Sequence, residues 1–272
     1  MSEVELAVTD HVATIMLNAP ERMNTISISM LDGLSEALLN ADADHEVRCI
    51  VLTGAGRAFC AGLDMAAQAK SGGGGLGGIG AVGETSIGQE RFSEINLRTA
   101  PPIVLHSIDT PTICALNGGA AGYGLDLALG CDIRIAVETA KLNSGFAKRG
   151  ILPESGGTWL LPRMVGYAKA AEIAFTGRTL TAGEALELGI VNHVAAAADF
   201  PGAVAALAAE IAANAPLAVR AIKRMMRAAE TETFEQNVHH VYLQLLPLIR
   251  SEDFVEGVTA YMEKRPATFT GR

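Results

Sequence analysis

The sequence predicts an α/β fold, and three observations support this class. Short apolar runs that end in glycine-rich turns alternate with stretches whose apolar residues recur at helical spacing. The chain has 272 residues, a length that a single α/β core often reaches. Hydrophobic residues make up 49% of the chain and charged residues 19%, which is typical of a globular protein rather than a disordered one.

The N-terminal half is predicted to contain a hairpin, a long helix and several buried strands. Residues 4–17 alternate apolar and polar side chains around Asp10-His11, which indicates a β-hairpin. Residues 27–42 carry apolar side chains at helical intervals behind Ser27, a favourable N-cap. Short apolar runs predict three further strands, at residues 49–52, 111–116 and 131–137.

After about residue 155 the pattern becomes almost wholly helical. The predicted helices cover residues 157–165, 167–175, 181–188, 200–213, 216–230, 233–246 and 251–264. Several of them have apolar faces too extensive for one small core, which indicates contacts between subunits. We therefore expect residues 1–198 to form the core and residues 199–272 to form a helical oligomerisation region.

Charge and cysteine usage exclude several classes of function. The formal net charge of −9 disfavours binding to nucleic acid or to anionic lipid. Cys49, Cys60, Cys114 and Cys131 lie in or beside apolar runs without CxxC spacing, which predicts buried free thiols in a reducing compartment. The sequence shows no signal-peptide pattern and no apolar stretch of about 18 residues that would span a membrane. We expect a cytoplasmic protein.

Three glycine-rich turns are candidates for chemistry. They cover residues 58–64, 117–124 and 152–157. A glycine turn that opens a helix leaves backbone N–H groups unpaired at the positive end of the helix dipole. Two such turns side by side would make an oxyanion hole, in which each donor is worth about 3 kcal/mol. The alternative is that these glycines only shape turns and allow close packing.

Two acids beside these turns are candidate acid–base residues. Asp126 follows Tyr123 by three residues, so both lie on one face of the helix predicted to begin there. Glu154 stands between the apolar residues 151–153 and Ser155, where burial would raise its pKa toward neutrality. Ser155 is the better helix cap of the two. The alternatives are that Asp126 only complements the helix dipole and that Glu154 is a cap or a surface residue.

Other signals for a binding site are weak. The segment 71–83, SGGGGLGGIGAVG, is expected to be mobile, and its GxGxxG match lacks the preceding strand and the following helix of a dinucleotide site. The chain has no GxSxG or HExxH motif, and we expect no metal site. Nicotinamide binding through residues 72–77 stays open as a third class of function.

Six stretches together resemble the enoyl-CoA hydratase/isomerase, or crotonase, superfamily over almost the whole chain. They are LNAPERMNTIS at 17–27, VLTGAGRAFCAGLDM at 51–65, PTICALNGGAAGYGLDLALGCDIRIA at 111–136, GILPESGGTWLLPRMVG at 150–166, FTGRTLTAGEALELGIVNHV at 175–194 and SEDFVEGVTAYMEKR at 251–265. The resemblance implies a crotonase-like spiral of ββα units with a C-terminal helical trimerisation region. It also implies a homotrimer or hexamer, an acyl-CoA thioester as substrate, and no permanently bound cofactor, coenzyme A being part of the substrate.

The resemblance also implies roles for particular residues. The two oxyanion N–H donors of the family fall on Leu63 and Tyr123. The neighbouring positions implied to bind the substrate are Ala61, Gly62, Asp64, Gly122 and Phe146. Arg22 is expected near the phosphates of CoA, and Lys264 near the adenosine part, with Lys264 supplied by a neighbouring subunit.

The acids at the matching positions indicate which reaction of the superfamily to expect. In the hydratases of the superfamily two glutamates hold water, and their positions correspond to Asp126 and Phe146, so the second acid is missing here. Some isomerases carry an acid eight residues further on, where this chain has Glu154. We therefore expect double-bond isomerisation with Glu154 as the proton shuttle. The alternatives are hydration by Asp126 and Glu154 together, and a CoA-binding scaffold without catalysis.

Overall fold

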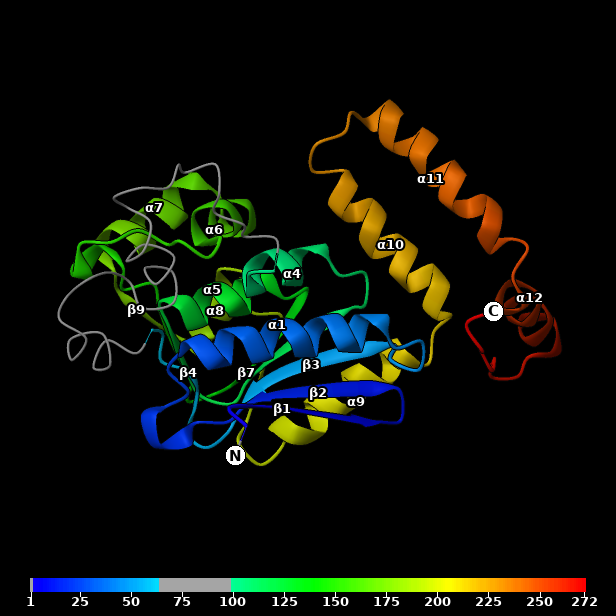
Figure 1. Cartoon of the computed structure of the whole chain (residues 1–272). Helices are drawn as coiled ribbons and strands as arrows, with labels where there is room; N and C mark the ends of the chain where they lie inside the picture. The colour runs from blue at the N-terminus through cyan, green and yellow to red at the C-terminus, as the bar shows by residue number, and fades with distance from the viewer. Residues whose placement is uncertain (1, 64–98) are drawn as a thin grey trace, which may run out of the picture.

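The computed structural model describes residues 2–63 and 99–272, which form two β-sheets surrounded by helices (Figure 1). This is the mixed α/β class that the sequence predicts. The predicted substrate residue Asp64 and the glycine-rich segment 71–83 lie outside the described residues.

The larger sheet has six strands in the order β1-β2-β3-β5-β7-β10. The strands are β1 (Val4–Thr9), β2 (Val12–Leu17), β3 (Cys49–Gly54), β5 (Thr112–Leu116), β7 (Ile133–Val137) and β10 (His193–Ala195). β1 and β2 form the predicted antiparallel hairpin, and the remaining pairs are parallel. Asp10 and His11 both have positive φ, 48° and 64°, as the tight turn of a two-residue hairpin requires.

The smaller sheet was not predicted from the sequence. It consists of β4 (Ala58–Cys60), β6 (Gly119–Ala121), β8 (Lys141–Asn143) and β9 (Thr179–Thr181), in that order. β4, β6 and β8 are parallel, whereas β8 and β9 are antiparallel. Each strand has three residues, which is too short to show an alternating pattern in the sequence.

Most of the helices begin and end close to where the sequence predicts. The α-helices are α1 (Ile28–Ala43), α4 (Pro101–Ser107), α5 (Tyr123–Gly130), α6 (Gly157–Val165), α7 (Tyr167–Thr176), α8 (Ala182–Glu187), α9 (Phe200–Ala212), α10 (Pro216–Ala228), α11 (Phe234–Leu248) and α12 (Glu252–Glu263). The described residues also contain the 3₁₀ turns η1 (Pro20–Arg22) and η3 (Ala147–Arg149). Ser27 caps α1 as expected, because its hydroxyl accepts a hydrogen bond from the Met30 N–H. Helix α4 was not predicted.

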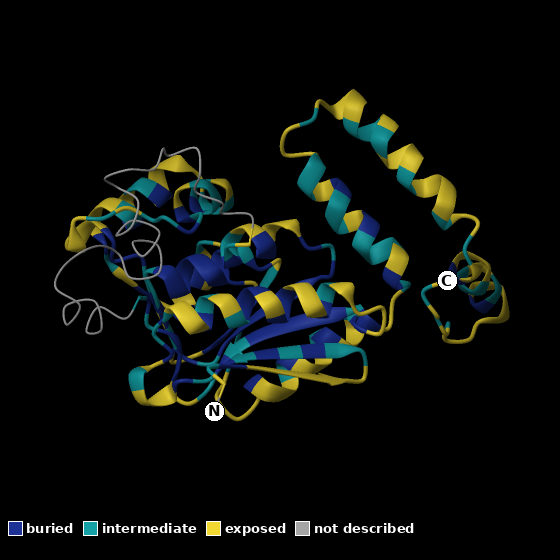
Figure 2. Cartoon of the chain, in the orientation of Figure 1, coloured by how far each residue is buried: buried dark blue, intermediate teal, exposed yellow. Residues whose placement is uncertain are grey.

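The hydrophobic core lies around the six-stranded sheet, whose central strands β3, β5 and β7 are largely buried (Figure 2). Helix α1 contacts β1 and β2, and α9 contacts β2, β3, β5, β7 and β10. Thus α9 packs on the sheet although the predicted boundary assigns residues 199–272 to the oligomerisation region. In contrast, α11 has no buried residue in the single chain. The boundary at residue 198 stays a prediction.

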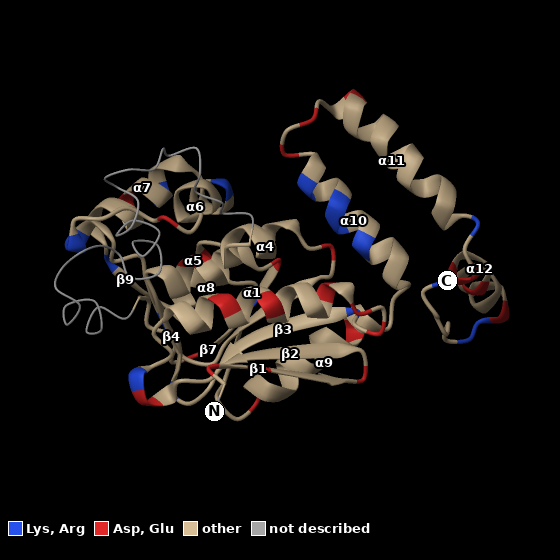
Figure 3. Cartoon of the chain, viewed as in Figure 1, with Lys and Arg blue, Asp and Glu red and all other residues tan. Residues whose placement is uncertain are grey.

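Helix α10 is attached to the core by ion pairs, and its basic residues are prominent along it in Figure 3. Arg220 pairs with Asp42 at 3.0 Å, and Lys223 pairs with Asp132 at 2.8 Å. The guanidinium groups of Arg224 and Arg227 both contact the carboxylate of Asp109. Half-buried ion pairs of this kind fix orientation, because each partner left alone would be poorly solvated.

Within residues 2–63 and 99–272, no single helix has the length and hydropathy to cross a membrane. Helices α9 and α10 reach that length and hydropathy only as a pair, which is bent by 100°. No group of three or more His, Cys, Asp or Glu residues with the geometry of a metal site occurs in the same residues.

Candidate active site

Two of the predicted glycine turns lie against each other. β4 and β6 are parallel neighbours, so the turns that follow them leave the same edge of the smaller sheet. Gly62 has φ +99°, and a Cβ atom built on it would lie 2.9 Å from the carbonyl oxygen of Ala121. A Cβ built on Gly124 would lie 2.3 Å from the carbonyl oxygen of Cys60. Glycine is therefore needed at both positions for the turns to approach this closely.

Each turn presents a backbone N–H without a backbone acceptor among the described residues. Tyr123 is the first residue of α5, so its N–H has no partner within the helix. Leu63 follows Gly62, whose carbonyl accepts a hydrogen bond from the Ile26 N–H, and no described backbone carbonyl accepts from the Leu63 N–H itself. The N–H of Tyr123 also benefits from the positive end of the α5 dipole.

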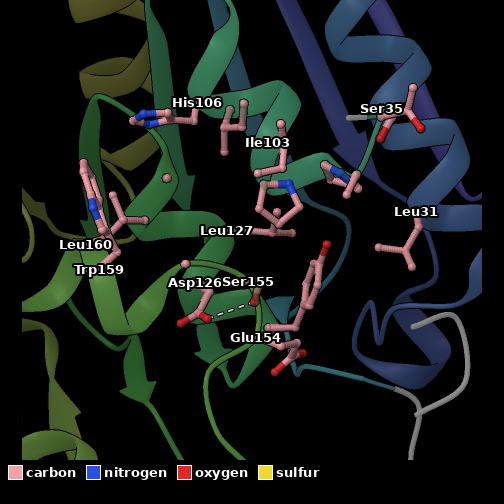
Figure 4. Close-up of a pocket in the computed structure, with 18 of the residues that line it drawn as sticks. Leu31, Ser35, Ile103, His106, Asp126, Leu127, Glu154, Ser155, Trp159 and Leu160 are labelled. Carbon is pink, nitrogen blue, oxygen red and sulfur yellow. Dashed lines mark hydrogen bonds between the residues drawn. The ribbon is translucent and has the colours of Figure 1, made fainter. Parts of the chain in front are cut away.

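A cavity of about 790 Å³ lies beside these turns and contains the candidate acids. Its described walls come from α1, α4, α5, α6 and the turn before α6. Figure 4 shows Asp126, Ser155 and Glu154 together at one end, with Ile103, His106 and Trp159 on other sides. Of the predicted site residues, Tyr123, Asp126 and Glu154 line this cavity. The volume is within the range of small-molecule sites.

Asp126 is buried, with 3% of its surface exposed, and one of its two carboxylate oxygens accepts hydrogen bonds. Its Oδ2 atom accepts a hydrogen bond of 2.9 Å from the Ser155 hydroxyl and one of 3.1 Å from the Gly157 N–H. Burial raises the pKa of Asp126 to about 7, against the opposing effect of these hydrogen bonds, and the nearby Glu154 carboxyl raises it further. Asp126 can therefore change its charge near neutral pH.

This arrangement corrects the expectation that Ser155 would cap α6. The N-cap of α6 is Gly156, with φ +104°, and no side chain caps the helix. The Ser155 hydroxyl donates to Asp126 instead, and the Asp126 carboxylate binds the free N–H of Gly157 at the helix N-terminus. The Asp126 carboxylate, which belongs to α5, thus acts as the cap of α6, because it accepts a hydrogen bond from an N–H that has no acceptor within α6.

Glu154 lies half-buried at the same end of the cavity. Its Oε1 atom is buried and has no hydrogen-bond partner among the described residues. Burial raises the pKa of Glu154, partly offset by its own backbone N–H. A carboxyl oxygen that is dry and unpaired is costly to keep, and it is the arrangement expected of a group whose partner is a substrate.

The phenol of Tyr123 belongs to the same cluster. Burial raises its pKa well above the ordinary value, and the nearby Glu154, Cys60 and Asp126 act in the same direction. The phenol therefore stays neutral and its hydroxyl keeps its proton. Tyr123 also lines the cavity.

The other predicted site residues lie at different places. Phe146 is buried before η3, and its ring lies about 3.9 Å from where a side chain on Gly122 would begin. Arg22, at the end of η1, forms an ion pair with Glu3. Lys264 is exposed at the end of α12, which in Figure 1 lies far from α4 and α5. The structure of the single chain therefore does not bring Lys264 to the cavity.

The sequence interpretation missed a large part of the cavity wall. Helix α4 contributes Ile103 and His106, α1 contributes Leu31, and α6 contributes Trp159. Helix α4 begins with two prolines, Pro101 and Pro102, and proline is favoured in the first turn of a helix, so a signal for it was present. Nothing in the sequence indicates that these three helices meet around one cavity.

The four cysteines are free and buried, as predicted. Burial raises the pKa values of the Cys49 and Cys60 thiols to about 12. They are therefore protonated at neutral pH and take no part in nucleophilic chemistry.

Comparison with known proteins identifies the family and supports the fold class. A model of the family "Enoyl-CoA hydratase/isomerase" matches residues 8–272. The 1,2-epoxyphenylacetyl-CoA isomerase of Escherichia coli is 37% identical over 96% of this chain and 95% of its own length. An enoyl-CoA hydratase of Mycobacterium tuberculosis is 33% identical over 96% of this chain and 94% of its own. The crystal structure of enoyl-CoA hydratase from Bacillus anthracis superposes with a TM-score of 0.88 at 31% identity, covering 99% of this chain and 100% of that one. The chain therefore belongs to the enoyl-CoA hydratase/isomerase family and has the crotonase fold.

Proposed function

We propose that this protein moves the double bond of an enoyl-CoA, with Glu154 as the group that carries the proton. The family supports an acyl-CoA substrate. The observation that carries the choice of reaction is the Oε1 atom of Glu154, which is buried and has no hydrogen-bond partner within the described part of the chain. An acid with a raised pKa and a free oxygen is suited to take a proton at neutral pH and to return it.

The thioester oxygen is held by the backbone N–H groups of Leu63 and Tyr123. The two N–H groups belong to adjacent turns and lack backbone acceptors among the described residues. The N–H of Tyr123 also lies at the positive end of the α5 dipole. Negative charge grows on this oxygen when a proton leaves the α-carbon. Two fixed donors stabilise that charge more than they stabilise the neutral thioester, so they lower the barrier.

The reaction then requires that a proton leaves C2, that a proton is added at C4, and that a side chain carries it between the two carbons. Glu154 takes a proton from C2 of a 3-enoyl-CoA, the electron pair of that C–H bond forms C1=C2, and the carbonyl pair moves to the thioester oxygen. When the carbonyl re-forms, the C1=C2 pair forms C2=C3 and the C3=C4 pair bonds to a proton at C4. Glu154 delivers this proton to C4, which gives the 2-enoyl-CoA. Asp126 lies in the same wall and orients the reacting carbons or serves as a second acid–base group. Phe146 cannot exchange protons, so it is assigned no chemical step.

The test compares Glu154→Gln with the unchanged protein in the conversion of 3-enoyl-CoA to 2-enoyl-CoA. Loss of a general acid–base should lower kcat by about 10²- to 10⁴-fold and leave KM within a few-fold. Glu187→Gln is the matched control, because Glu187 is exposed on α8. Undiminished turnover in Glu154→Gln would remove Glu154 from the mechanism. Undetectable turnover of every acyl-CoA by the unchanged protein, with CoA still bound, would indicate a scaffold.

Deuterium at C2 of the substrate distinguishes proton transfer by one carboxyl from proton transfer by two separate acids. A single carboxyl that moves the proton should transfer part of a C2 deuterium to C4 of the product. Two separate acids that exchange with water should leave C4 without label. Mass spectrometry of the product gives the answer directly.

Hydration of a 2-enoyl-CoA is the second candidate, and one observation favours it. Asp126 and Glu154 line the same end of the cavity and interact closely enough that Glu154 raises the pKa of Asp126. Hydration needs one group to activate water and another to protonate C2, and this pair meets the requirement. Rapid formation of 3-hydroxybutyryl-CoA from crotonyl-CoA would favour hydration over isomerisation.

We also propose that residues 199–272 hold the chain in a homotrimer or hexamer. Helices α11 and α12 expose large apolar side chains, including Tyr242 at 63% and Tyr261 at 82% exposure. A patch of this kind is usually covered in solution. In such an assembly Lys264 of one subunit would reach the CoA of its neighbour, and Arg22 would bind phosphate in exchange for Glu3. Light scattering of the purified protein measures the number of subunits.

A further inference from the structure

We propose that the side of the cavity formed by His106 and Trp159 is a stacking site for an aromatic ring, carried close to the reacting carbons of the acyl group. This proposal rests on the proposed acyl-CoA function and names the class of acyl group. Both residues line the cavity that contains Asp126 and Glu154. In Figure 4 His106 lies at the upper left with Trp159 below it at the left, and the acids lie lower in the same cavity.

Trp159 is held in a fixed orientation. The Arg163 guanidinium lies 3.8 Å from the centre of the Trp159 ring and donates a hydrogen bond of 3.0 Å to the Trp159 carbonyl. His106 meets the indole edge-on, with ring centres 5.4 Å apart and planes inclined by 79°. Contacts with a cation and with a second ring restrict the indole before any ligand binds. A preorganised aromatic surface loses little entropy when a ring packs on it.

The position of Trp159 on α6 limits where the ring must be attached. Gly157, whose N–H binds Asp126, is only two residues away on the same helix, which is about 3 Å along the axis. Trp159 and the N–H that binds Asp126 therefore belong to one short helix, and Asp126 itself lies on the neighbouring helix α5. The aromatic side thus has a fixed position relative to the acids. We expect a ring with a short link to the reacting carbons to reach both sides of the cavity.

Charge in the described wall favours an uncharged ring. The carboxyls of Asp32, Asp126 and Glu154 line the cavity, and no Lys or Arg does so within residues 2–63 and 99–272. A carboxylate on the acyl group would be desolvated next to these acids without a cation to pair with it. An acyl group with a neutral aromatic ring avoids this cost.

Three CoA thioesters with eight acyl carbons each give a direct test. Phenylacetyl-CoA carries an aromatic ring, cyclohexylacetyl-CoA carries a saturated ring, and octanoyl-CoA carries no ring. Isothermal titration calorimetry measures Kd for each without any catalytic step. A merely apolar cavity binds the saturated ring at least as well as the aromatic one, because cyclohexyl has the larger apolar surface. A preference for phenylacetyl-CoA therefore reports contact between rings.

We expect phenylacetyl-CoA to bind about 2- to 10-fold more tightly than cyclohexylacetyl-CoA, the effect of one aromatic contact. Trp159 is the only tryptophan of the chain, so its fluorescence should also change more with phenylacetyl-CoA than with octanoyl-CoA. Equal Kd values for the two ring compounds would overturn the proposal and leave the acyl-CoA function intact. Failure of all three to bind would overturn both.

Variants of Trp159 test whether this residue causes the preference for the aromatic ring. Trp159→Leu should abolish the preference between the two rings and change the Kd of octanoyl-CoA by less than about 2-fold, and Trp159→Phe should keep part of the preference. Phe175→Leu is the matched control, because Phe175 is 74% exposed on α7 and does not line this cavity. A preference that survives in Trp159→Leu would also contradict the proposal.

Discussion

The hydroxyl of Ser155 donates a hydrogen bond of 2.9 Å to Oδ2 of Asp126, and both side chains are at least 97% buried. The bond joins the acid of α5 to the turn that carries Glu154. It is stronger when Asp126 is ionised than when it is protonated, because a charged acceptor roughly doubles its strength. The contribution of Ser155 to stability therefore depends on the charge of its partner.

Ser155→Ala should lower the free energy of unfolding by about 1 kcal/mol at pH 5 and by about 2 to 3 kcal/mol at pH 8.5. The change occurs around the pKa of Asp126, about 7, because Asp126 is protonated below it and ionised above it. Urea unfolding at the two pH values measures both differences. Ser144→Ala, at a similarly buried serine, should show no such change with pH. A Ser155→Ala effect that is equal at both pH values would contradict the assigned charge.

Asp126→Asn should become more stable relative to the unchanged protein as pH rises. The pKa of Asp126 is raised from 3.8 to about 7 in the fold, so its stabilising contribution is complete below pH 3.8 and is lost as pH rises through 7. Asparagine does not titrate, yet its oxygen still accepts from Ser155 and Gly157. The difference in unfolding free energy should move in favour of Asp126→Asn by about 3 kcal/mol between pH 5 and pH 8.5. Movement in the opposite direction would mean that Asp126 is ionised in the fold at low pH.

The main elements of the fold were predictable because each is long enough to show its own period. Helix α1 and strands β3 and β5 have continuous apolar patterns, and the hairpin has its turn at Asp10-His11. The smaller sheet and helix α4 were missed because three-residue strands and a seven-residue helix show too little pattern. These short elements hold together only through tertiary contacts, which a local pattern does not contain.

The candidate site was predictable where a residue is unusual for its local surroundings. Glu154 among apolar residues and the glycines of the two turns stood out in the sequence, and they lie close to the cavity. Trp159 did not stand out, because a tryptophan in an apolar helical pattern is equally consistent with a core position. The role of Ser155 was predicted wrongly for a related reason. Its partner, Asp126, lies 29 residues away and is brought near only by the fold.

Gly157→Ala should disrupt the acid cluster more than an ordinary glycine substitution. A Cβ atom there would lie 2.2 Å from Oδ1 of Asp126 and 2.8 Å from its Cγ atom. The carboxylate would have to leave its hydrogen bonds with Ser155 and Gly157, so we expect a loss of about 1 to 3 kcal/mol in stability. Turnover of 3-enoyl-CoA should fall by at least about 100-fold, because Asp126 and Glu154 shift together.

The control for Gly157→Ala is Gly183→Ala, on the exposed face of α8. No atom lies within 4 Å of the built Cβ atom, and alanine is the better helix former, so stability should rise by up to about 1 kcal/mol. Thermal unfolding and turnover of both variants give the comparison. Near-normal turnover in Gly157→Ala would mean that the contact with Asp126 is not needed for the reaction.

Gly62→Ala tests whether the close contact between the turns after β4 and β6 aligns the two N–H donors. The added Cβ would lie 2.9 Å from the Ala121 carbonyl oxygen, which is backbone and has no flexible end to move aside. The turn with the Leu63 N–H should shift away from Tyr123, so kcat should fall by about 10²- to 10³-fold, as when one oxyanion donor is lost. Gly150→Ala controls for backbone strain, because Gly150 also has positive φ, +71°, but no atom lies within 4 Å of its built Cβ. Both variants should lose about 1 kcal/mol or more in stability from the strained φ, whereas only Gly62→Ala should lose kcat. An equal loss of kcat in the two would attribute the effect to strain in general, and the alignment of Leu63 with Tyr123 would then not explain catalysis.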